Sequence, residues 1–135
     1  MKSSLTVIFL FLSGMLLLVI GGTILLLPHV FYANDGILLG NDPSLLSEIR
    51  ASGGLLAGSS LVILFGTFRP NLRSLAMILT ILVYGSFGIS RLLGMVLDGM
   101  PSDGLIIATA IELIVAAIGL LILYYQPLAE DSNMA

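Results

Sequence analysis

Four long apolar runs constrain this chain more than any other feature of its sequence. They cover approximately residues 5–27, 46–68, 72–97 and 105–125, and each is near or above the ~20 residues that an α-helix needs to cross a bilayer. Hydrocarbon offers no hydrogen bonds, so each run must satisfy its own backbone groups, which favours helices. The alternation typical of a membrane barrel is absent. The sequence therefore predicts an all-α fold, an integral membrane four-helix bundle with antiparallel, up-down-up-down helices.

The composition agrees with lipid as the solvent. Hydrophobic residues make up 58% of the 135 positions and charged residues 10%, whereas soluble domains are about half apolar and about a quarter charged. The five basic residues form no patch, so we expect no nucleic-acid partner. With no cysteine and one histidine, His29, the chain offers no recognisable metal or cofactor ligand set.

Prolines divide the chain into its predicted elements. They fall between the runs and after the last one: Pro28, Pro43, Pro70, Pro101 and Pro127. We expect a single transmembrane domain over residues 1–127 and a disordered cytoplasmic tail over 128–135. The connection 28–43 is rich in turn residues and has room for a short interfacial helix. The first run is too long for a signal peptide, whose apolar region spans roughly 7–15 residues, so we expect it to be a span.

The orientation follows from the residues near the span ends. Three basic residues lie on one side of the membrane and four acidic residues in the connections on the other: Lys2, Arg69 and Arg73, against Asp35, Asp42, Asp98 and Asp103. Because lysine and arginine favour the cytoplasmic side, both termini are predicted to be cytoplasmic.

Four ionisable residues lie within or at the edge of the spans: Glu48, Arg50, Arg91 and Glu112. At ~1.5 Å per helical residue, Arg91 lies roughly 10 Å and Glu112 roughly 13 Å from the connection between the last two runs. Arg50 lies about one turn into the second run. Charged residues in a membrane face the protein interior or a wet cavity. We therefore expect these groups to meet at one level in the outer half of the bundle.

Small residues share the helix faces of these charges. The residues three, four or seven positions away include Gly53 and Gly54 near Arg50, Gly88 and Gly94 near Arg91, and Ala108, Ala116 and Gly119 near Glu112. Small residues let membrane helices approach closely. The pattern predicts that Glu112 is bridged by Arg50, Arg91 or both, in an outward-opening pocket between the second, third and fourth helices. Glu48 points to another side.

This polar cluster has three interpretations. It fixes the register of the helices, it binds an anionic metabolite or lipid headgroup through its arginines, or it relays protons through Glu112. The serines have no histidine and acid at a recognisable spacing, so nucleophilic catalysis has no support. An enzyme would need an acid/base pair such as Glu112 and Asp98 beside a substrate, and we expect the chain not to be an enzyme.

Two motifs resemble those of a known family. The first is Glu48-Ile-Arg50-Ala-Ser-Gly53-Gly54, and the second runs from Arg91 to Asp98-Gly99-Met-Pro101, followed by Glu112 on the last helix. Together they resemble an uncharacterised family of small bacterial four-span membrane proteins, classed as a domain of unknown function, over residues 21–121. The resemblance implies the architecture and a recurring set of Arg50, Arg91, Asp98 and Glu112. A looser similarity, in size and helix number, is to four-span proteins of the DoxX type.

These patterns predict a non-enzymatic protein of the bacterial inner (plasma) membrane. Its polar cluster of Arg50, Arg91, Glu112, Asp98 and Glu48 binds a small anionic or lipid ligand, or the protein stabilises a membrane partner. The alternative is a small transporter or channel subunit with Glu112 as its coupling carboxylate. Four helices leave little room for alternating access, so transport would require a homo-oligomer.

Overall fold

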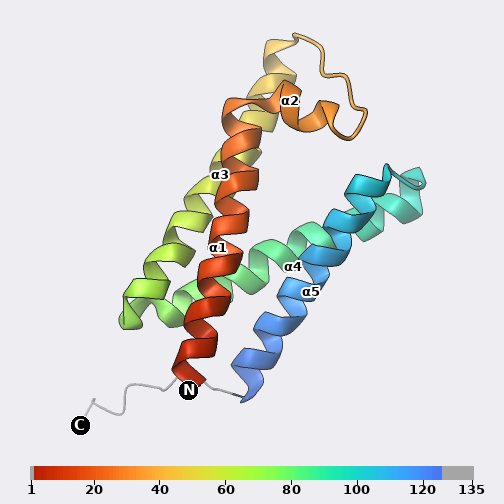
Figure 1. Ribbon diagram of the computed structural model, residues 1–135. Helices are drawn as coiled ribbons and strands as arrows, with labels where there is room; N and C mark the ends of the chain where they lie inside the picture. The colour runs from red at the N-terminus through yellow and green to blue at the C-terminus, as the bar shows by residue number, and fades with distance from the viewer. Residues whose placement is uncertain (1, 126–135) are drawn as a thin grey trace.

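The structure is a computed structural model that describes residues 2–125, and this part of the chain is helical (Figure 1). Its elements, in chain order, are α1 (Lys2–Leu26), α2 (Pro28–Ala33), α3 (Pro43–Phe68), the 3-10 turn η1 (Pro70–Leu72), α4 (Arg73–Asp98) and α5 (Asp103–Tyr125). Four of these, α1, α3, α4 and α5, are long and apolar enough to cross a membrane. The predicted all-α four-helix bundle is confirmed, and the chain is an integral membrane protein. The predicted tail lies outside the described residues.

The helix ends differ from the predicted ones by a few residues because of capping. The second span begins at Pro43 rather than at residue 46, since the Asp42 side chain accepts a hydrogen bond of 2.8 Å from the Leu45 backbone N–H and proline suits the first helical position. Pro28 has no N–H and interrupts the helix after α1. The first connection does hold a short helix, α2.

The long helices are arranged as two pairs. Helix α1 packs along α3, and α4 packs along α5, while η1 links α3 to α4. Contacts between the pairs come mainly from α3 with α4. In Figure 1 the two pairs lie close together near η1 and diverge toward the end that carries α2. We call these two ends of the molecule the η1 end and the α2 end.

The tightest packing lies toward the η1 end. Leu10 of α1, Ile63 of α3, and Ala76 and Met77 of α4 are fully buried there. Gly66 of α3 packs directly against Ala76 with no room for a side chain of its own. The α2 end is less tightly packed between the pairs, which leaves space for a cavity there.

Two hydrogen bonds tie the pairs together on either side of this space. The hydroxyl of Tyr84 on α4, a buried residue, donates to the Ser13 carbonyl on α1 at 2.7 Å. At the α2 end, the Ser102 hydroxyl donates to the Asp35 carboxylate at 3.1 Å. Ser102 directly precedes α5, where a negative charge interacts favourably with the helix dipole. The Asp35 carboxylate occupies the place where a side chain on Gly104 would begin.

Helices α1 and α3 cross at a pair of glycines. A methyl carbon on Gly21 would lie 2.5 Å from the Ala57 backbone nitrogen, and one on Gly53 would lie 2.6 Å from the Leu25 nitrogen. Backbone atoms cannot move aside as flexible side chains do, so both positions require glycine. This crossing sets the distance between α1 and α3. Both helices line the cavity.

We predict that Gly21→Ala destabilises the protein by about 1–3 kcal/mol, because a methyl group must force apart two packed backbones. Gly22→Ala is the matched control, since a methyl group there meets no atom within 4 Å and alanine favours the helix by up to about 1 kcal/mol. Circular dichroism during detergent unfolding measures both. A Gly21→Ala variant as stable as Gly22→Ala would contradict the packing described here.

Candidate functional site

The centre of the site is an ion pair between α4 and α5. The Nε atom of Arg91 donates to both carboxylate oxygens of Glu112, at 3.1 Å to Oε2 and 3.3 Å to Oε1. The two side chains are 29% and 14% exposed. Gly88, one turn before Arg91, lets α5 come close: a methyl carbon there would lie 3.3 Å from the backbone nitrogen of Leu113 and closer to its side chain. The predicted pairing of Glu112 with Arg91 is present.

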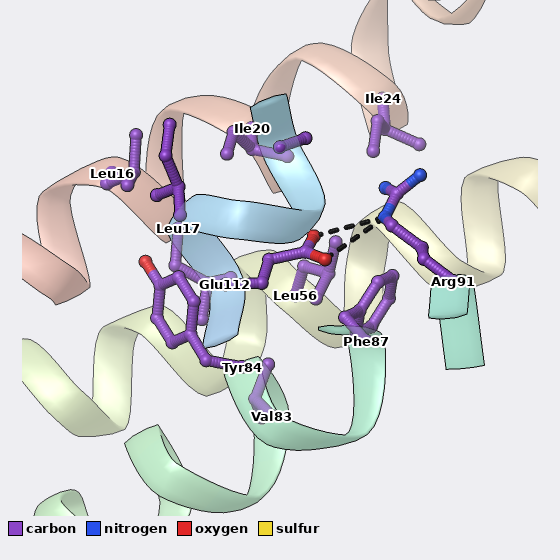
Figure 2. A pocket seen from close by; sticks show the side chains of 12 residues that line it. Leu16, Leu17, Ile20, Ile24, Leu56, Val83, Tyr84, Phe87, Arg91 and Glu112 are labelled. Carbon is purple, nitrogen blue, oxygen red and sulfur yellow. Dashed lines mark hydrogen bonds and ion pairs between the residues drawn. The ribbon is translucent and has the colours of Figure 1, made fainter. Parts of the chain in front are cut away.

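This pair lines a cavity of about 100 Å³ between the two helix pairs (Figure 2). The remaining lining side chains are apolar apart from Tyr84, and all four long helices contribute: Leu16, Leu17, Ile20, Ile24, Leu56, Val83, Tyr84, Phe87, Ala108 and Ile111. An otherwise apolar chamber therefore contains two opposite charges. In Figure 2 the Glu112 carboxylate projects into the centre of this chamber.

The predicted location of the pocket, between the second, third and fourth spans, left out α1. Four of its residues come from α1 and one, Leu56, from α3. The reason is the pairing of helices: α3 packs against α1, which separates it from α5. The cavity therefore lies between the two helix pairs rather than at the centre of a ring of three helices.

Arg50 forms a hydrogen bond with the end of α1 and does not bridge Glu112. Its Nη1 donates to the backbone carbonyl of Leu25. Pro28 interrupts the helix there, so carbonyls in the last turn of α1 lack their usual N–H partners. Arginine side chains commonly satisfy such carbonyls. The alternative in which Arg50 bridges Glu112 was thus wrong, and the physical reason is this competing acceptor on the adjacent helix.

The other two predicted cluster residues lie apart from the ion pair. Glu48 is exposed at the start of α3. Asp98 is exposed at the end of α4, where it lines a second cavity of about 220 Å³ near the turn to α5. Arg91 also lines this second cavity, together with Gly94, Met95, Gly99, Pro101, Leu105 and Thr109. Arg91 therefore lines both the apolar cavity and the second cavity. The second cavity is the more polar of the two and lies toward the α2 end.

Sequence reasoning missed the contribution of α1 to the site. Leu17, Ile20 and Ile24 lie among apolar residues on all sides of their helix, so no periodicity marks the face that meets the cavity. The place of Tyr84 in the site could have been predicted, because Tyr84 is seven residues before Arg91 and shares its helix face.

The Arg91 guanidinium retains capacity for a further partner. Glu112 uses the Nε donor, and Figure 2 shows the two terminal nitrogens directed away from the carboxylate, toward Ile24. Within residues 2–125 these terminal nitrogens bond to no other protein group. They present the forked donor geometry that matches a phosphate or carboxylate.

Comparison with known proteins adds a family and no activity. The family model described as a domain of unknown function (DUF4345) matches residues 5–123. No curated protein and no solved structure matches the chain.

Proposed function

We propose that this chain, which belongs to the DUF4345 family of unknown function, is a non-enzymatic membrane protein that binds an amphiphilic ligand, a lipid or a small apolar acid, in the cavity between its helix pairs. The observation that carries the proposal is a charged pair, Arg91 and Glu112, in an otherwise apolar chamber. An apolar chamber with a few convergent polar groups is the usual form of a small-molecule site.

The unused donors of Arg91 support a ligand over a purely structural pair. A guanidinium at membrane depth needs acceptors for its N–H groups, since hydrocarbon supplies none. An acidic headgroup would supply them, while its apolar body would contact the leucine and isoleucine walls. Glu112 then serves as a positioning residue that holds the Arg91 guanidinium in place.

We also propose that the protein lies in the bacterial inner membrane, with both termini in the cytoplasm. Lys2, Arg69 and Arg73 lie at the η1 end, which favours the cytoplasmic side for that end. The α2 end and the second cavity, which Asp98 lines, would then face outward.

We expect protein purified in mild detergent to retain an amphiphile that native mass spectrometry detects. Ala108→Leu should remove most of it, because Ala108 lines the apolar cavity and carries no charge. Ala110→Leu is the matched control, since Ala110 is exposed on the same helix. Equal retention by the two variants, both shown to be folded by circular dichroism, would contradict the proposed site.

A second candidate function, a small transporter or channel subunit, is favoured by the position of Arg91 between the two cavities. Asp98, Arg91 and Glu112 form a series of ionisable groups from the α2 end toward the membrane interior, as proton pathways often do. Such a protein would act as a homo-oligomer.

For this candidate, Glu112→Gln should abolish proton flux across liposomes that contain the protein, because glutamine cannot exchange a proton. Glu48→Gln, which changes the same charge at an exposed position outside both cavities, should leave the flux intact. Unchanged flux in Glu112→Gln would eliminate the transport function.

A further inference from the structure

The second cavity places a lone carboxylate beside Arg91. Asp98 lies seven residues after Arg91, on the same face of α4, and both side chains line this cavity. A methyl carbon on Gly94 would lie 3.9 Å from Asp98 Oδ2, so the aspartate side chain extends along the helix in the direction of Arg91. The cavity therefore holds a cationic and an anionic group on one wall.

The charge of Asp98 is not balanced by the protein. Within residues 2–125, the ion pair of the structure joins Arg91 to Glu112, and Asp98 has no cationic partner. The α2 end also carries further carboxylates: Asp35, Asp42, Glu48 and Asp103. A ligand that brought only negative charge to Arg91 would meet repulsion from Glu112 and Asp98 together. A ligand that also carried a positive charge would reduce this repulsion.

We infer that the amphiphile of the proposed function, on which this inference rests, carries a zwitterionic headgroup of the ethanolamine phosphate type. Its phosphate oxygens accept from the terminal nitrogens of Arg91, and its primary ammonium donates to Asp98. The part of its apolar body nearest the headgroup enters the cavity of about 100 Å³ that Glu112 lines, and the rest of the acyl chains lies in the bilayer. Asp98 is then the specificity-determining residue: it selects a headgroup with N–H donors over a choline, whose quaternary nitrogen has none, and over an uncharged glycerol.

The test uses delipidated full-length protein and native mass spectrometry with lipids of matched acyl chains. The probes are phosphatidylethanolamine, phosphatidylcholine, phosphatidylglycerol and free ethanolamine phosphate. We expect the ethanolamine lipid to bind roughly fivefold more tightly than the choline and glycerol lipids, as one partly exposed ion pair allows. Free ethanolamine phosphate should bind more weakly than the lipid, because it leaves the apolar cavity empty.

Asp98→Asn should remove the preference for ethanolamine over glycerol, while Glu48→Gln, the control at the same end, should retain it. Equal binding of the three lipids to the unsubstituted protein, or an unchanged preference in a folded Asp98→Asn variant, would overturn the inference and leave the proposed function standing. Absence of binding by every lipid would overturn the inference, and the proposed function itself would fall only if Ala108→Leu and Ala110→Leu also retained the purified amphiphile equally.

Discussion

The inability of hydrocarbon to solvate charge determines how this protein is built. Arg91 and Glu112 lie within spans that are otherwise almost wholly apolar, and each supplies the counter-charge that the other needs. Their contact sets the register of α4 against α5 at one level. The same constraint explains Arg50, which reaches the backbone carbonyl that the break at Pro28 leaves without an N–H partner.

The arrangement of the long helices in two pairs leaves a cavity between the pairs. Glycines bring α1 onto α3 at Gly21 and Gly53, and bring α5 onto α4 at Gly88. Between the pairs, packing is tight toward the η1 end and looser toward the α2 end, and Tyr84 and Asp35 respectively donate and accept the connecting hydrogen bonds on either side of the cavity. A cavity with apolar walls and one ion pair follows from this arrangement. Its chemistry matches the junction between the polar and apolar parts of an amphiphile.

The number of spans and the pairing of Glu112 with an arginine could be predicted from the sequence, because both follow from what lipid permits, but whether Arg50, Arg91 or both make the pair stayed open. Spans are marked by length and hydropathy, and buried charges of opposite sign at one depth must meet. Helix pairing was not readable, since α1 is apolar on every side and gives no sign that it covers α3. The alternative that Arg50 bridges Glu112 could not be excluded for a related reason: the acceptor of Arg50 is the Leu25 backbone carbonyl, and residue types do not show which carbonyls a helix break frees.

A double-mutant cycle on Arg91 and Glu112 measures how far the stability of the protein depends on the pairing of these two charges. The unfolding free energies of Arg91→Gln, Glu112→Gln and the double variant would be measured in detergent against the unsubstituted protein. We predict that the double variant is more stable than the sum of the two losses allows, by about 0.5–3 kcal/mol, because each single change leaves one unpaired charge and the double change leaves none. Losses that simply add would show that the two side chains do not depend on each other.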